Sequence, residues 1–219
     1  MSSPDLSPGR RLVVLDVDST LITGEVVEML AARAGSLELV TRITERAMRG
    51  EIDFAASLHE RVATLAGLPV SVFADVLDEV ELSPGAAELI ADLASRGWPV
   101  GLVSGGFVEV VEPLAARLGI TLTHANRLEA RDGMLTGRVS GDVVDRAAKA
   151  VTLRDYAARV GLPLSRTIAI GDGANDLDMV TAAGFGIAFN AKPLLCAAAD
   201  AVVRDRLDAV LDLPVFAAG

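Results

Sequence analysis

The sequence predicts an α/β fold in which a mainly parallel β-sheet is interrupted by an inserted block of helices. Apolar runs typical of buried strands lie at residues 12–15, 99–103 and 167–170, and each ends in a polar or glycine-rich turn. Segments with helical periodicity alternate with the later strands. Between residues 23 and 80, helical segments instead follow one another without a strand, which indicates an insertion.

Four helices are expected in this insertion, at residues 25–34, 37–49, 53–66 and 69–80. Gly35 and Gly67 follow two of them, as glycine often does at helix C-termini. We therefore divide the chain into a flexible leader (1–10), a catalytic core (11–22 and 81–219) and a helical cap (23–80). Insertions after a strand's carboxyl end lie over the active-site face, so the cap is expected to act as a lid.

The alternation resumes at residue 83. Further helices are expected at 83–96, 108–118, 145–160 and 176–183, and further strands at 121–123, 185–189 and 201–203. Residues 126–130 and 134–139 are expected to form a peripheral hairpin, because the Asp132-Gly133 pair between them is typical of a tight turn.

Composition excludes several classes of function. A chain of 219 residues can bury one core plus a modest cap, and 51% hydrophobic with only 4% aromatic residues indicates an aliphatic core. The net charge of -10 argues against a nucleic-acid or anionic-membrane partner. No signal or membrane-spanning segment is recognisable, so a cytoplasmic location is expected. The single cysteine, Cys196, excludes an intramolecular disulfide, and its apolar neighbours predict a buried, inert thiol.

Asp16 and Asp18 follow the first strand directly. Ligand sites of open α/β sheets lie beyond the carboxyl ends of the strands, so both acids are expected at the mouth of such a site. Two neighbouring negative charges call for a cation, and oxygen ligands without nearby His or Cys suit Mg²⁺. The alternative is an ordinary turn, in which Asp and Ser are common.

Three later segments can serve the same site. Ser104 and Gly105 follow the second strand and could bind a phosphoryl group through a hydroxyl and a main-chain N–H, although such a stretch is also a common turn. Lys149 lies among alanines and could reach a phosphate, or could simply be a solvated helix residue. The segment 171–176, Gly-Asp-Gly-Ala-Asn-Asp, favours a metal site over a loop capped by Asn175.

In order and spacing, these four segments resemble the motifs of the haloacid dehalogenase superfamily of phosphotransferases, and the chain looks most like its phosphoserine phosphatases. Shared segments outside the catalytic turns are Glu25, Ala125-Asn126-Arg127-Leu128 and Ala191-Lys192-Pro193. The resemblance covers residues 12–211 and implies a Rossmann-like core with a C1-type helical cap. It further implies Mg²⁺-dependent hydrolysis of O-phospho-L-serine to L-serine and phosphate, the last step of serine biosynthesis. The alternative is a phosphatase or phosphotransferase of the same superfamily that acts on another small phosphorylated metabolite.

The resemblance also implies roles for individual residues. Asp16 would be the nucleophile that forms an aspartyl-phosphate, and Asp18 the general acid and base. Ser104 and Lys149 would hold the transferring phosphoryl group. Groups expected to hold Mg²⁺ are the Asp16 carboxylate, the Asp18 main-chain carbonyl, the Asp172 carboxylate and, through a water molecule, Asp176.

Substrate choice is expected to depend on the cap. Glu25 would meet the ammonium group and Arg61 the carboxylate, while Met48 and Phe54 would exclude water. Gly105 and Asn175 complete the implied substrate-binding set. The alternatives are that Glu25 is a favourable helix N-terminal charge, Arg61 a surface residue, and Met48 and Phe54 parts of the cap core.

Three further expectations complete this interpretation. Val17 departs from the aromatic residue or Met that is frequent between the two acids of the family, which affects packing only. His59 and His124 lack metal-ligand spacing. The expected partner is a small phosphorylated molecule, with no nucleic acid and no membrane, and the protein is expected to be a monomer or homodimer.

Overall fold

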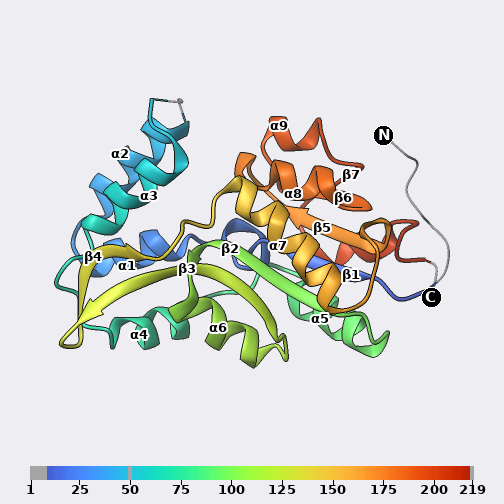
Figure 1. Ribbon diagram of the computed structural model, residues 1–219, viewed down its shortest axis with the longest axis horizontal. Coiled ribbons are helices and arrows are strands. Elements are labelled where there is room, and N and C mark those ends of the chain that lie inside the picture. Colours follow the sequence, from blue (N-terminus) through green and yellow to red (C-terminus); the bar gives the residue numbers. More distant parts are fainter. Residues whose placement is uncertain (1–8, 49–50, 218–219) are drawn as a thin grey trace.

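The computed structural model describes residues 9–48 and 51–217 (Figure 1), and the side chain of Met48 is outside the described part. Residues 1–8 of the expected leader also lie outside the described residues. One seven-stranded sheet has the order β4-β3-β2-β1-β5-β6-β7. The strands are β1 (Leu12–Leu15), β2 (Val100–Phe107), β3 (Leu122–Arg131), β4 (Met134–Ser140), β5 (Thr167–Gly171), β6 (Phe185–Phe189) and β7 (Ala201–Val203). All neighbours pair in parallel except β3 and β4, so the predicted fold class is confirmed.

Helices cover both faces of the sheet (Figure 1). They are α1 (Val26–Arg33), α2 (Leu37–Met48), α3 (Phe54–Ala63), α4 (Val72–Glu79), α5 (Ala86–Ser95), α6 (Val108–Arg117), α7 (Arg146–Arg159), α8 (Leu177–Ala182) and α9 (Pro193–Cys196). Alternate residues of β1 enter two separate apolar clusters. Val13 and Leu15 pack with α5 and α6, whereas Leu12 and Val14 pack with α7, α8 and α9. This two-sided burial explains the uninterrupted apolar run of β1.

Helices α1 to α4 occupy the chain between β1 and α5, and α2 and α3 stand together beyond the β4 edge of the sheet (Figure 1). No strand lies within the described part of residues 23–80, apart from an isolated bridge at Pro69. The division of the chain into leader, core and cap stays a prediction.

The predicted hairpin lies at the edge of the sheet, as expected, but it is larger than predicted. Residues 121–123 and 126–130 belong to one continuous strand, β3, that joins the parallel sheet to the hairpin. The hairpin also bonds to the chain after α3: Gly67 N–H donates to Leu135 O at 2.9 Å, and Leu135 N–H donates to Leu68 O at 2.8 Å. The hairpin therefore supports the helical insertion in addition to forming the peripheral edge of the sheet.

Three smaller features also differ from the prediction. Ser104–Phe107 extends β2, where a turn was expected. The short helix α9 and a 3₁₀ segment at Leu207–Asp212 were not predicted. Cys196, at the end of α9, is only partly buried, and its Sγ lies 3.3 Å from Ala191 O, so the expectation that this thiol is buried was wrong. Among the described helices, none is both long and apolar enough to cross a membrane.

Candidate active site

The carboxyl ends of β1 and β5 bring the first acids together. Asp16 N–H donates to Ile170 O at 3.0 Å, which extends the β1–β5 pairing to the last residue before the turn. Asp172 follows the end of β5 directly. After Asp16 the chain makes a tight turn over Val17–Leu21, in which Ser19 has a φ of 58°. This uncommon conformation for a residue with a side chain sets the direction of the turn.

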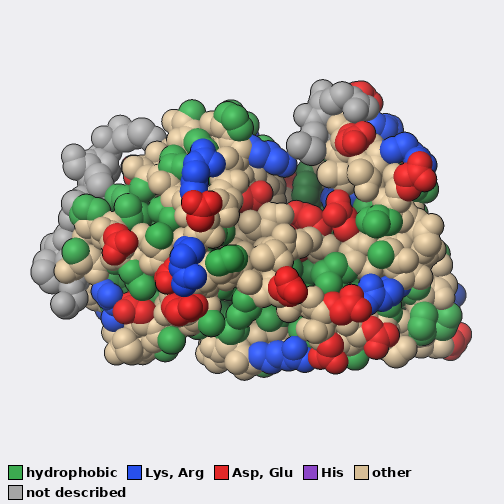
Figure 2. All heavy atoms as spheres, turned by 180° about the vertical axis from the view of Figure 1, so that it is seen from behind, with side chains coloured by type: hydrophobic (Ala, Val, Ile, Leu, Met, Phe, Trp, Pro, Cys, Tyr) green, Lys and Arg blue, Asp and Glu red, His purple; other side chains and the backbone are tan. Residues whose placement is uncertain are grey.

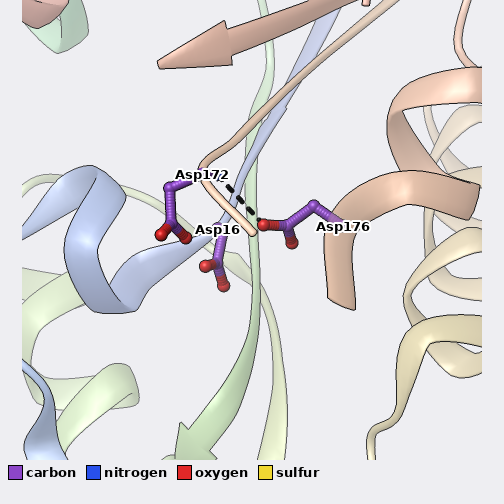
Figure 3. A group of neighbouring side chains, drawn as sticks. All are labelled: Asp16, Asp172 and Asp176. Atoms are coloured by element: carbon purple, nitrogen blue, oxygen red, sulfur yellow. Dashed lines mark hydrogen bonds between the residues drawn. The ribbon is translucent and has the colours of Figure 1, made fainter. Parts of the chain in front are cut away.

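Asp16, Asp172 and Asp176 form a compact acidic cluster (Figure 3). One carboxylate oxygen from each residue lies within 4.8 Å of the others. Burial, together with the neighbouring Asp176 carboxylate, raises the pKa of Asp16 well above its ordinary value and that of Asp172 to about 6. The cluster therefore has more negative charge than its surroundings compensate, and a hard divalent cation fits this set of oxygen donors.

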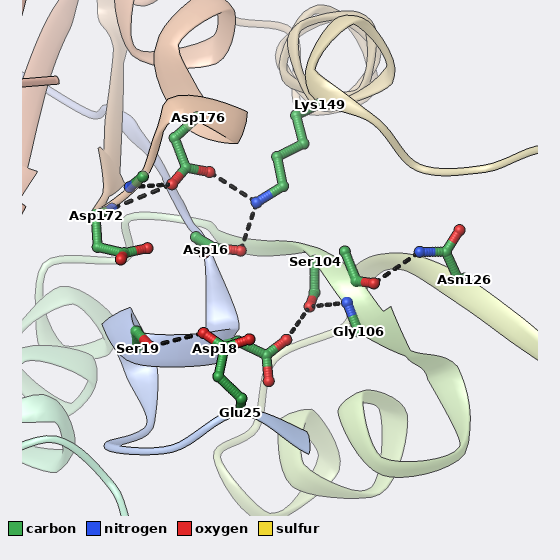
Figure 4. A network of polar contacts seen from close by, with 12 residues as sticks. Asp16, Asp18, Ser19, Glu25, Ser104, Gly106, Asn126, Lys149, Asp172 and Asp176 are labelled. Carbon is green, nitrogen blue, oxygen red and sulfur yellow. Dashed lines mark hydrogen bonds and ion pairs between the residues drawn. The ribbon is translucent and has the colours of Figure 1, made fainter. Parts of the chain in front are cut away.

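Lys149 lies within the same cluster and not in solvent. Its side chain is 0% exposed, and Nζ donates to Asp16 Oδ1 at 2.6 Å and to Asp176 Oδ1 at 2.7 Å (Figure 4). Burial by itself lowers the pKa of Lys149, but the two adjacent carboxylates outweigh burial and hold the pKa above its ordinary value. Lys149 is therefore a buried cation, which excludes the alternative of a solvated helix lysine.

Asp176 organises the loop after β5. Its Oδ2 accepts hydrogen bonds from Asp172 N–H and Gly173 N–H, both at 3.1 Å, while Oδ1 faces Lys149. A Cβ at position 171 would lie 2.5 Å from Asp176 Cγ, so the close approach of this carboxylate requires glycine there. Asp176, and not Asn175, is thus the residue that caps this loop, in contrast to the alternative weighed from the sequence.

Asp18 is held from two sides. Its Oδ1 accepts from Val26 N–H at 2.8 Å, and its Oδ2 accepts from Ser104 Oγ at 3.0 Å. A Cβ at Gly106 would lie 2.5 Å from Asp18 Oδ2, so this approach also requires glycine. Burial raises the pKa of Asp18, although the hydrogen bonds from Val26 and Ser104 act in the opposite direction. The raised pKa favours the protonated carboxyl, which is the form able to donate a proton.

A cavity of about 50 Å³ connects these groups with the helical insertion. Its walls are formed by Asp16, Asp18, Glu25, Val27, Phe54, Leu58, Arg61, Gly105, Gly106 and Asn175. Five of the residues predicted to bind substrate line this cavity: Glu25, Phe54, Arg61, Gly105 and Asn175. Ser104 and Lys149 lie behind its walls, where they bond to Asp18 and Asp16. The side chain of Met48 lies outside the described residues. Figure 2 shows the surface hollowed beside the end of the molecule that contains α2 and α3, with acidic side chains gathered there.

Glu25 and Arg61 place opposite charges in this cavity. Glu25 precedes α1 but makes no capping hydrogen bond there; its Oε1 accepts from Ser19 Oγ at 2.8 Å. Burial and the nearby Asp18 raise the pKa of Glu25 to about 7. Arg61, on α3, is buried and donates from Nε to Ser57 O at 3.2 Å. Arg61 is therefore not a surface residue.

Phe54 closes the cavity opposite the C-terminal part of β2. A Cβ at Gly105 would lie 2.9 Å from Phe54 Cζ, so the ring packs directly against the Gly105 backbone. Neither histidine lines the cavity. His124 Nδ1 lies 2.6 Å from Thr152 Oγ1, a contact between β3 and α7, and His59 is exposed.

Comparison with known proteins agrees with this geometry. The sequence profile of the haloacid dehalogenase-like hydrolases matches residues 13–181. The chain belongs to this family.

Three relatives of the hydrolase illustrate the similarity. It is 57% identical over 205 residues to the phosphoserine phosphatase SerB2 of Mycobacterium tuberculosis, covering 93% of this chain and 50% of the relative. It is 54% identical over 190 residues to the phosphoserine phosphatase of Streptococcus thermophilus, covering 87% and 88%. A solved substrate-bound phosphoserine phosphatase complex superimposes with a TM-score of 0.88 at 39% identity, covering 93% and 98%. The chain spans half the length of the first relative.

Sequence reasoning assigned no role to Ser19 or Asn126, which the structure places beside the predicted residues of this haloacid dehalogenase-like hydrolase. Asn126 is 1% exposed and bonds to the main chain of Gly105. A carboxamide within an otherwise buried strand segment is the signal that could have identified it, because buried polar groups are nearly always hydrogen-bonded.

The raised pKa of Glu25 predicts a pH-dependent stability in the metal-free hydrolase. Because the folded pKa of about 7 exceeds the ordinary 4.5, protonation favours the folded state. This contribution is complete below pH 4.5 and is lost as pH rises through about 7. The glutamine of Glu25→Gln cannot ionise. The free energy of unfolding of this variant, relative to that of the wild type, should therefore increase as the pH rises from 5 to 8.

Urea denaturation of the wild type and of Glu25→Gln, at pH 5 and at pH 8, measures the difference between their free energies of unfolding. Glu38→Gln, which removes one exposed charge from α2, controls for the general effect of net charge. An equal difference between Glu25→Gln and wild type at both pH values would contradict the raised pKa.

Proposed function

We propose that this hydrolase removes the phosphoryl group from O-phospho-L-serine and releases L-serine and phosphate, the last step of serine biosynthesis. The observation that carries the proposal is one cavity lined by two acids of the catalytic turn, Asp16 and Asp18, together with the oppositely charged Glu25 and Arg61. Phosphoserine has a phosphate, an ammonium group and a carboxylate, and this cavity offers a partner for each. The relatives that carry the name phosphoserine phosphatase support the same substrate.

The reaction follows from the contacts of the two acids. The Asp16 carboxylate attacks phosphorus and forms an aspartyl-phosphate; Lys149 binds its Oδ1 and leaves Oδ2 as the attacking atom. Protonated Asp18 gives its proton to the departing serine oxygen. Asp18 then takes a proton from a water molecule that attacks the same phosphorus, which releases phosphate and regenerates Asp16. The Gly105 main-chain N–H holds a phosphoryl oxygen, and Asn175 lines the substrate cavity. Ser104 acts through Asp18, because its single hydroxyl proton is donated to Asp18 Oδ2.

Mg²⁺ is the proposed cofactor. The Asp16 and Asp172 carboxylates, with the main-chain carbonyl of Asp18, would hold it directly. Both oxygens of Asp176 already accept hydrogen bonds, which favours an indirect role through water. When bound, the ion neutralises charge on the phosphate and the carboxylates.

The helical insertion is the proposed lid. A cavity of about 50 Å³ has room for only a few water molecules, so a phosphorylated amino acid requires α3 to move before it can enter. Phe54, and Met48 with it, would then exclude water after closure. The same proposal includes residues 23–80 as the cap, a cytoplasmic location, and a monomer or homodimer. It also includes the absence of nucleic-acid or membrane partners, which the net charge of -10 supports.

Phosphate release from phosphoserine, measured with Mg²⁺ and with excess EDTA, tests the proposed function. Turnover with Mg²⁺ that EDTA abolishes and added Mg²⁺ restores is the expected result. A non-catalytic protein that only binds phosphorylated metabolites would show no release under either condition. Release that EDTA leaves unchanged would contradict the proposed cofactor.

Arg61→Ala is predicted to impair the hydrolysis of phosphoserine far more than that of phosphoethanolamine, which keeps the ammonium group but lacks the carboxylate. Loss of a charged hydrogen-bond partner costs about 2–4 kcal/mol, so kcat/KM for phosphoserine should fall by roughly 30-fold or more. Arg46→Ala is the matched control, because Arg46 lies on α2 and pairs with Glu60 at the exposed surface. Equal losses for the two substrates would refute a carboxylate clamp.

A further inference from the structure

Asn126 uses both ends of its carboxamide to join two parts of the active site. On β3 it is 1% exposed, and it touches main-chain groups rather than the cavity. Its Nδ2 donates to Gly105 O at 2.8 Å, and its Oδ1 accepts from Val144 N–H at 2.8 Å. Both interactions are at good hydrogen-bond distance, so the side chain is fixed at each end.

The hydrogen bond from Asn126 to Gly105 is the first of a series that leads to Asp18, the proposed general acid. Gly105 C=O and Gly106 N–H belong to one planar peptide, so a bond to the carbonyl also fixes the direction of the N–H. Gly106 N–H donates to Ser104 Oγ at 2.8 Å. Ser104 has a single hydroxyl proton, and it donates that proton to Asp18 Oδ2 at 3.0 Å. Figure 4 shows this series of contacts from Asn126 to the Asp18 carboxylate.

The hydrogen bond from Val144 N–H holds the same side chain beside the start of α7. Val144 precedes Asp145, whose Oδ1 caps α7 by accepting from Ala148 N–H at 2.9 Å. Lys149 lies one turn further along this helix. Asn126 therefore ties the Gly105 peptide to the helix that carries the buried lysine.

We propose that Asn126 is a positioning residue for proton transfer by Asp18. It acts through the Gly105–Gly106 peptide and Ser104, which together set the orientation of the Asp18 carboxyl. The inference rests on the proposed function, because it assigns Asn126 to the step in which the serine oxygen leaves. It also gives a role to the Ala125-Asn126-Arg127-Leu128 segment, which the proposed chemistry leaves without one.

Two substrates with different leaving groups test this role. Departure of serine needs a proton, whereas acetate leaves acetyl phosphate without one. The ratio kcat/KM reports steps up to the first irreversible one, so it isolates the departure of the leaving group from the later hydrolysis of the aspartyl-phosphate. For Asn126→Ala, we expect kcat/KM to fall by roughly 10- to 100-fold with phosphoserine and by less than about 3-fold with acetyl phosphate, since positioned acid catalysis contributes about 10²–10⁴-fold.

Asn126→Asp is the second variant, because it preserves side-chain size and the acceptor toward Val144 N–H while it removes the donor to Gly105 O. This variant should show the same difference between the two substrates. It keeps the test possible if Asn126→Ala does not fold. His124→Ala is the matched control: this residue also lies on β3, but its side chain contacts Thr152 of α7 instead of Gly105. Its kcat/KM should stay within about 2-fold of the wild type for both substrates, the margin expected for a surface contact of little energy.

Equal losses with phosphoserine and acetyl phosphate would overturn the positioning role and leave only a structural one. Unchanged kinetics in a folded Asn126→Asp protein would overturn it as well. Failure of the proposed function is distinguishable, since in that case the wild-type protein itself would release no phosphate from phosphoserine.

Discussion

Asp16→Asn is expected to abolish phosphate release from phosphoserine, with kcat reduced by roughly 10⁴-fold or more, the order observed when a covalent nucleophile is removed. An amide oxygen cannot form the aspartyl-phosphate. The variant also removes a carboxylate from the acidic cluster with Asp172 and Asp176, so binding of Mg²⁺ should weaken. Steady-state release of phosphate, measured at saturating Mg²⁺, gives the size of the loss.

The loss of activity should not be accompanied by a loss of fold. Burial and the nearby Asp176 raise the pKa of Asp16, which means that its charge is unfavourable in the folded protein without metal. An asparagine lacks this charge and still offers an oxygen to Lys149. The metal-free variant should therefore unfold at the same urea concentration as the wild type, or at a higher one.

Asp200→Asn is the control for this substitution, because Asp200 accepts from Gly186 N–H at 2.8 Å far from the cavity and asparagine can do the same. The control should keep full activity. Retention of more than about 1% of the activity by Asp16→Asn would contradict its role as the nucleophile, because loss of a nucleophile costs several orders of magnitude.

Lys149→Met is expected to impair both stability and activity. Methionine fills a similar volume but leaves the Asp16 and Asp176 carboxylates without their shared cation. Because the lysine side chain is 0% exposed, water cannot readily replace this cation. Breaking a buried ion pair by removal of one partner costs about 3–5 kcal/mol of unfolding free energy. The loss should be larger at pH 8 than at pH 5, since burial and the nearby Asp176 raise the pKa of Asp16, which can take up a proton at the lower pH and so relieve the repulsion.

Mg²⁺ offers a second test of the same cluster. A divalent cation supplies positive charge where the lysine is missing, so added Mg²⁺ should raise the melting temperature of Lys149→Met by more than that of the wild type. Arg146→Met is the matched control, because Arg146 lies on the same helix and pairs with Asp178 at the exposed surface. Its unfolding free energy should change by less than about 1 kcal/mol. Equal stability of Lys149→Met and wild type would refute the compensating role of the lysine.

The catalytic segments could be predicted from the sequence because each one comes at the end of a buried apolar run. The runs that precede Asp16, Ser104 and Asp172 all belong to parallel strands, and parallel strands present their carboxyl ends at one edge of a sheet. The strand β2 itself continues through Ser104 to Phe107, which the run did not predict. Lys149 was different, since a single lysine on a helix is usually solvated. Only the packing of α7 against β1 and α8 shows that its Nζ lies between two carboxylates.

Features that depend on distant contacts were not predictable from local patterns. An Asp-Gly turn identifies a hairpin but does not show that Leu135 of this hairpin bonds to Gly67 and Leu68 after α3. Asn126 poses the same difficulty, because its two partners, Gly105 and Val144, are main-chain groups from other segments. The α9 helix of four residues is too short for its periodicity to be recognised.

The central claim is that the cavity between Asp16 and Arg61 selects phosphoserine. The most direct measurement is kcat/KM with Mg²⁺ for phosphoserine, phosphothreonine, phosphocholine and a set of sugar phosphates. We predict that phosphoserine exceeds every other compound, because it alone places a compact ammonium and carboxylate pair beside the phosphate without an extra methyl group. A clear preference for any other compound of the panel would contradict the claim and identify the hydrolase as a phosphatase for a different small metabolite.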